Sequence, residues 1–261
     1  ALIVDEGDPF STLLVNKSIN EIRARNIFGS VEHQVVEGSS PDLRVLEISV
    51  EEMPTGEISA GAGIGTDGGS FAFAVSENNW LGKGATLSAN AEVSQDSLRG
   101  SLSYTDPDYN FTGQELSYFI KNVKNDKSDS GYENNILGAG IGLSYEKFKD
   151  IYFSPGLSLE YDDLKTDDTA SQLLKKQSGT STDLLFNYSL STDKRDRRFM
   201  PTSGYYTSFS QEIPFYSDQP HLKNGISTSH YKELNEDIIG ALKFRAFAVN
   251  GIGDDLSLIH I

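Results

Sequence analysis

The chain has 261 residues, of which 22 are basic and 38 acidic, so it carries a formal net charge of −16. Nucleic-acid binding requires a basic footprint and a cytoplasmic-leaflet anchor requires a polybasic segment, so this charge argues against both functions. The chain has no cysteine, which excludes disulfides and thiolate zinc sites. No run of 18 apolar residues occurs. This excludes helical membrane spans but not a membrane barrel, because barrel strands alternate.

The first fifth of the chain predicts a helix followed by a β-hairpin. Ser11 or Thr12 can cap a helix that runs to about Asn26, in which apolar residues recur on one face. Two short strands follow, Val31–Val36 and Leu43–Val50, and a cluster of Gly, Ser, Pro and Asp forms the turn between them. We therefore expect a small α+β module in front of the rest of the chain.

A domain boundary is predicted at Met53–Gly56, and no helix pattern appears after it. Instead, about eleven segments of roughly ten residues alternate apolar residues with polar or small ones, as membrane-barrel strands do. The second face consists of Ser, Gly, Asn, Asp and Glu almost throughout, which favours a membrane barrel over a soluble β-sandwich. The predicted strands are residues 57–66, 70–78, 85–94, 97–105, 115–124, 137–146, 151–162, 183–192, 203–213, 222–232 and 238–249.

The connections and the aromatic residues support this interpretation. Asp67–Gly69 predicts a tight hairpin, whereas residues 125–133 and 165–179 predict long charged loops. Short turns on one side and long loops on the other are typical of outer-membrane barrels. Aromatic residues near predicted strand ends match interfacial girdles; they are Trp80, Tyr104, Tyr109, Tyr118, Tyr145, Tyr161, Tyr188 and Tyr205.

Two expectations concern the ends of the chain. No signal peptide is visible in Ala1–Glu6, although an outer-membrane protein needs one, so we expect the true N-terminus to lie upstream. Single-chain bacterial barrels have even strand counts, so about eleven strands predict a barrel whose C-terminal part follows residue 261.

Several motifs resemble the outer-membrane protein assembly factors of the bacterial surface antigen superfamily. Residues 21–31 are similar to the helix-to-strand passage of that family's last POTRA module, and residues 55–66 resemble its Gly-rich first barrel strand. Residues 78–84 match its N-W-L-G-x-G turn, and residues 105–109 are close to its T-x-P-Y motif, with one residue inserted. Residues 196–204 match its D-R-x-x-x-P-T-x-G segment. These motifs together cover nearly the whole chain.

The sequence departs from the family in two places. The inward loop motif V-R-G-F does not occur in it. The tail Ser257–Ile261 differs from the polar, aromatic-rich segment expected there.

The resemblance implies a fold and a function. The fold is all-β: an antiparallel up-and-down transmembrane β-barrel over residues 54–261, incomplete with about eleven strands, preceded by the C-terminal part of an α+β POTRA module over residues 1–53. The implied function is to fold β-barrel proteins and insert them into the bacterial outer membrane, through a lateral gate at the first barrel strand. The implied location is the outer membrane, with the N-terminal module in the periplasm. The implied partners are unfolded outer-membrane protein clients, assembly-machinery lipoproteins, and outer-membrane lipid and lipopolysaccharide.

The resemblance also implies three groups of site residues. A lateral gate would use the first barrel strand, which glycine weakens by entropy and by lost side-chain packing; its residues are Gly56, Ile58, Ala60, Gly61, Ala62, Gly63, Ile64 and Gly65. An interfacial turn comprises Asn79, Trp80, Leu81, Gly82 and Gly84. A lumen or strand-end group comprises Asp196, Arg197, Pro201, Thr202 and Gly204. Arg197 would either face the lumen or be a surface charge at a strand end.

Alternative functions remain open on the sequence alone. One is a transporter of the same superfamily, of the TamA or two-partner-secretion type, and another is a passive porin, which the N-terminal module disfavours. The histidines are scattered without metal-ligand spacing, and no G-x-S-x-G motif occurs, so we expect neither an enzyme nor a cofactor or metal site.

Overall fold

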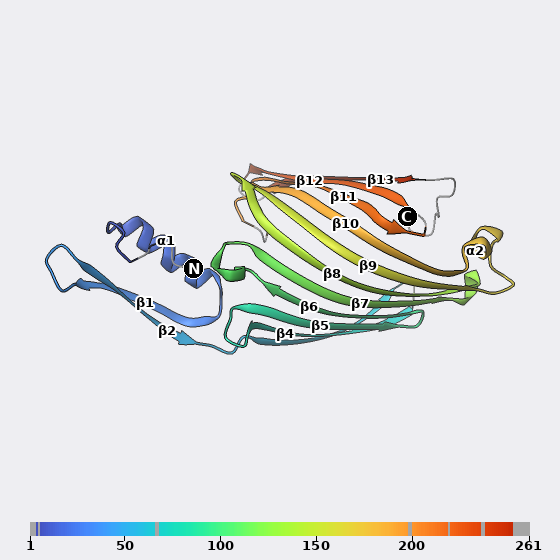
Figure 1. The fold of residues 1–261 in the computed structure, drawn as a ribbon, viewed down its shortest axis with the longest axis horizontal. Coiled ribbons are helices and arrows are strands. Elements are labelled where there is room, and N and C mark those ends of the chain that lie inside the picture. Colours follow the sequence, from blue (N-terminus) through green and yellow to red (C-terminus); the bar gives the residue numbers. More distant parts are fainter. Residues whose placement is uncertain are drawn as a thin grey trace.

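The computed structural model describes residues 4, 6–65, 68–197, 200–218, 220–235 and 238–252. In this part of the chain, a helix and a two-stranded sheet precede a single sheet of eleven strands (Figure 1). Thr66 of the first predicted strand, Asp67 of the predicted hairpin and the tail 257–261 lie outside the described residues. None of the described helices is both long and apolar enough to cross a membrane.

The described residues up to Met53, called the N-terminal unit from here on, contain the predicted helix and hairpin. Helix α1 (Thr12–Ala24) begins at Ser11, whose hydroxyl accepts a hydrogen bond from the backbone N–H of Leu14. Strands β1 (Phe28–Glu37) and β2 (Arg44–Glu52) pair antiparallel. The helix and the hairpin are therefore confirmed, while their assignment to a POTRA module stays a prediction, because these elements alone do not show one.

A small core holds this unit together. Val15 and Ile19 of α1 are buried against Val31 of β1, and Leu46 and Ile48 of β2 pack around them. The spacing of the two helix residues places them on one helix face, and alternate residues of β2 reach the same core. The unit thus has its own apolar interior, separate from the large sheet.

The large sheet is an antiparallel meander in which each strand pairs with its neighbours in sequence. All eleven predicted strands are present, so this part of the prediction is confirmed. The strands are β3 (Gly56–Gly65), β4 (Gly68–Trp80), β5 (Ala85–Ser94), β6 (Ser97–Asp106), β7 (Glu115–Lys127), β8 (Tyr132–Phe148), β9 (Ile151–Thr166), β10 (Gly179–Asp193), β11 (Gly204–Ser217), β12 (His221–Asn235) and β13 (Ile238–Gly251).

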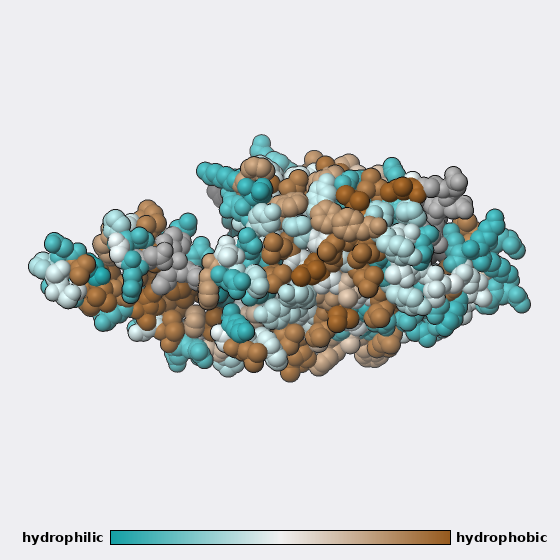
Figure 2. Space-filling view, in the orientation of Figure 1, coloured by the Kyte–Doolittle hydropathy of each residue, from teal (hydrophilic) through white to brown (hydrophobic). Residues whose placement is uncertain are grey.

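The two faces of this sheet differ in polarity. The sheet is curled and open, with β3 at one edge and β13 at the other (Figure 1). Apolar side chains of paired strands share the outer face, where Phe73 lies opposite Ala60 on β3 and Ala91 on β5. Phe71 and Ile64 on this face keep 71% and 96% of their surface exposed. Figure 2 shows the resulting apolar band across the sheet, with hydrophilic residues gathered at the right-hand end of the molecule.

Strand direction fixes the end at which each connection lies. One end, next to the N-terminal unit, carries the 3₁₀ turn η1 (Tyr109–Phe111) and residues 81–84, 149–150, 194–197 and 200–203. The opposite end carries the loops with η2 (Ser128–Ser130) and α2 (Gln172–Gln177), both of which the sequence predicts as long loops.

The predicted separation of short turns from long loops is only partly correct. The β3–β4 hairpin joins its strands at the same end as the two long loops, because odd-to-even connections of a meander all fall on one side. The described residues 194–197 and 200–203 of the β10–β11 connection lie at the other end, which also carries the N-terminal unit. Loop length alone therefore does not assign a connection to an end of the sheet.

Candidate functional site at the edge strand

Strand β3 is an edge of the large sheet. Among the described residues it pairs only with β4, in a register from Gly56 opposite Glu77 to Gly65 opposite Gly68. One row of its N–H and C=O groups therefore points away from its single partner, as in any edge strand. All eight residues predicted for the gate lie on this strand, and every residue of β3 is exposed; the eight are Gly56, Ile58, Ala60, Gly61, Ala62, Gly63, Ile64 and Gly65.

The glycines of β3 are not required by packing within the described residues. A Cβ atom added at Gly61 or Gly65 would meet nothing within 4 Å, and at Gly63 it would make ordinary contact with Ser70. At Gly140, inside the sheet, an added Cβ would lie 2.5 Å from the ring of Phe119. The glycines of the edge strand thus leave it thin and weakly packed without a steric reason.

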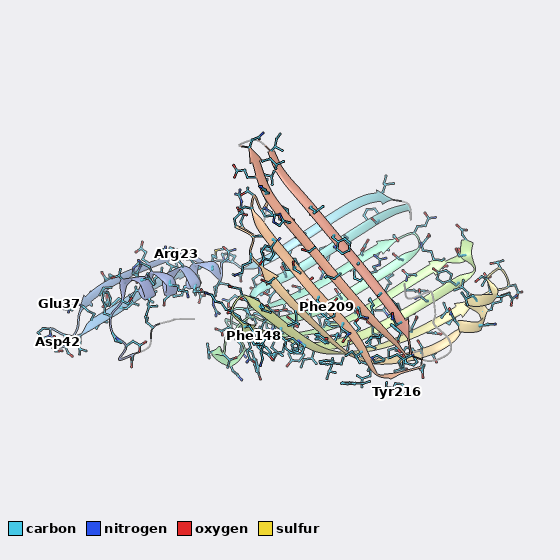
Figure 3. All side chains as sticks on the ribbon, turned by 90° about the horizontal axis from the view of Figure 1, so that it is seen from above. Arg23, Glu37, Asp42, Phe148, Phe209 and Tyr216 are labelled. Carbon is cyan, nitrogen blue, oxygen red and sulfur yellow. The ribbon has the colours of Figure 1, made fainter. Side chains whose placement is uncertain are left out.

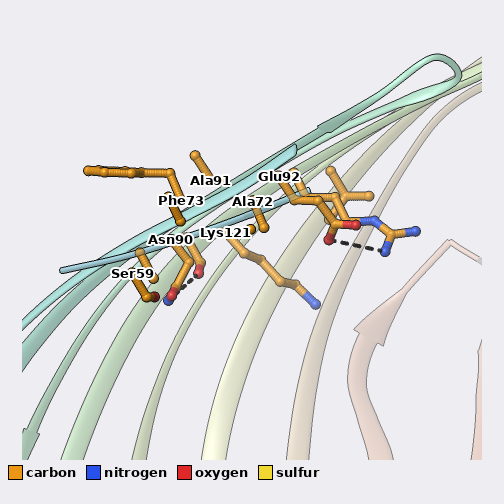
Figure 4. A pocket seen from close by; sticks show the side chains of 14 residues that line it. Ser59, Ala72, Phe73, Asn90, Ala91, Glu92 and Lys121 are labelled. Atoms are coloured by element: carbon orange, nitrogen blue, oxygen red, sulfur yellow. Dashed lines mark hydrogen bonds and ion pairs between the residues drawn. The ribbon is translucent and has the colours of Figure 1, made fainter. Parts of the chain in front are cut away.

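Beside β3, the concave face of the sheet forms a hollow of about 620 Å³. In Figure 4, Ser59, Asn90 and Lys121 project into this hollow, whereas Phe73 and Ala91 point to the other side of the sheet. The alternation of the strands produces this division, because successive side chains of a strand point to opposite faces.

Charged and polar pairs cover the concave face. The Lys121 ammonium lies 2.6 Å from the Glu160 carboxylate, two strands away, and Lys223 lies 3.1 Å from Glu212. Ion pairs and amide groups are costly in hydrocarbon and stable in water, so this face is suited to a wet cavity.

Apolar rings gather on the outer face. Tyr145 contacts Phe153, which contacts Tyr188, which contacts Phe209, with ring centroids about 6 Å apart at each step. These residues belong to four neighbouring strands, β8 to β11. Phe209, the last ring of the row, is labelled in Figure 3. Contacts of this kind stabilise a sheet across its strands.

The predicted interfacial turn connects β4 to β5. Asn79 organises it, because its side-chain oxygen accepts a hydrogen bond from the Gly84 N–H at 2.8 Å and its backbone carbonyl accepts one from the Gly82 N–H at 2.9 Å. Leu81, Gly82 and Gly84 have positive φ, which glycine adopts readily and leucine rarely does. Trp80, the last residue of β4, is partly exposed at this end. The structure brings these five residues together in one tight turn.

The third predicted group lies in the connection between β10 and β11. The Asp196 carboxylate accepts hydrogen bonds from the backbone N–H groups of Thr202 and Ser203, at 2.9 and 3.1 Å, and from the Thr202 hydroxyl at 2.8 Å. These bonds, led by the one from Ser203, lower the pKa of Asp196 to about 2. The carboxylate thus closes the loop around Pro201.

Arg197 and Gly204 have different positions in this loop. The Arg197 side chain is exposed and lies 3.5 Å from the Asp196 carboxylate, so its predicted contact with the lumen stays a prediction. Gly204 begins β11 with φ +92°, and an added Cβ would lie 2.1 Å from the Lys194 carbonyl oxygen. Only glycine fits at this position.

Sequence reasoning missed one contact between the two parts of the molecule. Arg25, which follows α1, forms an ion pair of 2.8 Å with Asp108 in the β6–β7 connection. No pattern in the sequence links these residues, because they are 83 positions apart and belong to different folding units. Among the described residues, no group of three His, Asp or Glu side chains could hold a metal ion.

These features agree with a comparison to known protein families. The Omp85 superfamily domain matches residues 79–260, which is more than half of the chain. The chain belongs to the Omp85 superfamily. This Omp85 chain is 29% identical over 227 residues to the outer membrane protein assembly factor BamA of Neisseria meningitidis, and 27% identical over 223 residues to BamA of Neorickettsia risticii. The resemblance inferred from the motifs is therefore confirmed.

Solved structures share the fold of this Omp85 chain. BamA from Haemophilus ducreyi lacking POTRA domains 1–3 superposes with a TM-score of 0.79 at 22% identity, over 97% of this chain and 52% of that one. CdiB from Acinetobacter baumannii gives a TM-score of 0.58 at 13% identity, over 98% and 50% of the two chains. The alignments cover 80% and 81% of this chain but only 28% and 29% of the two curated BamA relatives.

Proposed function

We propose that this chain is part of an outer membrane protein assembly factor, which folds and inserts β-barrel proteins into the bacterial outer membrane. The observation that carries the proposal is the division of the large sheet into an exposed apolar outer face and a charged concave face. Lipid can cover the first face and water can fill the second, which a soluble domain of this size would not allow. The names of the relatives support the same role.

In this proposal the sheet is a section of a transmembrane barrel. The end that carries η2 and α2 faces the outside of the cell, and the end beside the N-terminal unit faces the periplasm. The N-terminal unit would then be the C-terminal part of a POTRA module, placed to receive clients before they reach the barrel. Assembly-machinery lipoproteins and lipopolysaccharide are further partners that the resemblance implies.

The gate would lie at β3. Its outward row of N–H and C=O groups needs a partner in the membrane, because each unpaired group costs several kcal/mol in hydrocarbon. The open packing at Gly61, Gly63 and Gly65 would make the pairing of β3 with a strand that closes the barrel weak. A client strand can replace that closing strand by β-augmentation, so the protein would assist insertion without catalysing a chemical reaction.

Site-specific crosslinking in the full-length protein tests this mechanism. A cysteine at Ala60 or Ala62 should crosslink to a cysteine in a nascent client strand stalled during assembly. The matched control is Ala139→Cys, since Ala139 is also an exposed alanine on the outer face, but lies on β8, which has partners on both sides. Equal yields at β3 and at β8 would contradict a gate at this edge.

A transporter of the same superfamily is the second candidate. The similarity to CdiB supports the fold alone, since the identity is 13%. Purified full-length protein in lipid vesicles separates the candidates. An assembly factor accelerates the folding of unrelated β-barrel clients, whereas a dedicated secretion pore leaves their folding rate unchanged.

A further inference from the structure

A second cleft, of about 790 Å³, lies at the junction between the N-terminal unit and the sheet. One wall comes from the N-terminal unit, with Ile27 and Val50, and the other from the sheet, with Leu116 and Tyr118. Tyr118 contacts Tyr104 on the outer face of β6, with ring centroids 6.2 Å apart. The cleft is thus an extension of the apolar outer face, located at the end beside the N-terminal unit.

The 3₁₀ turn η1 provides the third wall of this cleft and has unusual backbone geometry. Phe111 has φ +59° and is 88% exposed, and Asn110 has φ +53°. A positive φ is strained for a bulky aromatic residue, and exposure of a phenylalanine ring to water is unfavourable. The turn therefore holds an apolar ring beside the cleft where the described protein does not cover it.

The charges at the cleft are balanced. Arg25 and Asp108 pair with each other at 2.8 Å, which leaves the Lys83 ammonium and the Asp106 carboxylate as one positive and one negative charge at the cleft. A headgroup that carries both a phosphate and an ammonium would find an opposite charge for each. An anionic headgroup could place its phosphate near Lys83 but would bring no cation for Asp106.

We propose that this cleft binds one zwitterionic phospholipid, with an acyl chain between Val50, Leu116 and Phe111 and the headgroup near Lys83 and Asp106. The proposal rests on the proposed function, because it places the outer face of the sheet in lipid. The bound lipid would be a structural part of the junction between the N-terminal unit and the sheet.

Native mass spectrometry of the delipidated full-length protein, titrated with dioleoyl-phosphatidylethanolamine in detergent, tests the proposal. The wild type should retain one lipid. Phe111→Asn, from the turn, and Val50→Asp, from the N-terminal unit, should each weaken its binding roughly tenfold. Asparagine tolerates the positive φ at position 111, so the first variant should fold. Dioleoyl-phosphatidylglycerol should bind no more tightly than the ethanolamine lipid.

The matched control is Leu81→Asn. Leu81 is also apolar, has φ +55° and is 75% exposed, and it lies in the neighbouring turn but does not line the cleft. This variant should bind the lipid within twofold of the wild type. Equal weakening at positions 81 and 111, or no retained lipid in the wild type, would overturn the proposal. So would loss of a copurified polypeptide from Phe111→Asn while lipid binding is unchanged, since a protein would then occupy the cleft.

Incorporation into vesicles separates this proposal from the proposed function. If the wild type enters phosphatidylethanolamine-containing vesicles but retains no lipid in detergent, only the lipid cleft is wrong. If the wild type does not enter vesicles, the proposed function fails as well.

Discussion

The guanidinium Nη2 of Arg25 lies 2.8 Å from Oδ2 of Asp108, and this ion pair joins the N-terminal unit to the β6–β7 connection. Both side chains are largely buried, and the other terminal nitrogen of Arg25 lies close to Gly84 in the β4–β5 turn. The end of α1 is thus held against two neighbouring turns of the sheet. We call this contact the junction pair.

The junction pair should restrict the orientation of the N-terminal unit. A hydrogen bond between charged groups contributes about 1.5 kcal/mol or more, which corresponds to roughly a tenfold shift between orientations. Arg25→Asp or Asp108→Arg in the full-length protein should broaden the distance distribution between spin labels at Glu47 and Lys147, and the double variant should narrow it again. Equal broadening in the double variant would show that the charges do not act as a pair.

Glycine has different roles at Gly204 and at Gly61, and substitution should separate them. Gly204→Ala should destabilise the protein by more than about 2 kcal/mol, since its Cβ would overlap the Lys194 carbonyl and its φ is +92°. Gly61→Ala should be neutral or stabilising by up to about 1 kcal/mol, because alanine fits there and suits a strand better. Urea unfolding of the full-length protein in detergent measures both.

The same Gly61→Ala variant should slow client insertion if a weak edge strand is needed for the gate. A matched control is Ala74→Gly on the neighbouring strand β4, which should lower stability without raising the insertion rate. If Gly61→Ala inserts clients at the normal rate, the weakness of β3 has no part in the mechanism.

The Asp196 loop should lose stability in acid over a defined pH range. The pKa of Asp196 is about 2 in the folded protein, below the usual 3.8, because Ser203 and Thr202 donate hydrogen bonds to its carboxylate. The stabilisation is therefore fully present above pH 4 and is lost as the pH falls from about 4 to about 2. Hydrogen exchange at the Thr202 and Ser203 amides should show this loss. In Asp196→Asn the same amides should be less protected at neutral pH and should show no such dependence.

The alternation of apolar and polar residues predicted all eleven strands, and for β5 it gave both ends of the strand. The prediction succeeds because each strand has one face toward apolar surroundings and the other toward polar ones, so the pattern is continuous along it. The first strand and its glycines are equally visible in the sequence, since Gly61, Gly63 and Gly65 alternate with apolar residues. The helix and hairpin before them were recognised from a cap and a turn cluster.

The pattern does not predict where the strands end beside the long loops. Strands β7 and β8 extend beyond the predicted segments, and amide pairs hold this extension: Asn122 donates to Asn135 at 2.9 Å and Asn125 to Asn134 at 3.0 Å. These asparagines do not alternate with apolar residues in a way that marks a strand. Their pairing becomes apparent only when the two strands are placed in register. The sequence does not predict the junction pair either, because this contact depends on how two folding units meet.

Neighbouring residues on β4 should respond oppositely to the same charge. Phe73 belongs to the outer face and Ala72 lines the concave hollow, so Phe73→Lys places an ammonium in lipid while Ala72→Lys places it in the cavity (Figure 4). Lysine on the lipid face near the centre of the bilayer costs about 2–4 kcal/mol, and on the lumen face it is tolerated. The yield of folded full-length protein in lipid vesicles should therefore fall for Phe73→Lys and stay near wild type for Ala72→Lys. If both variants fold equally well in vesicles, the outer face does not meet lipid, because the cost of the charge depends only on what surrounds it.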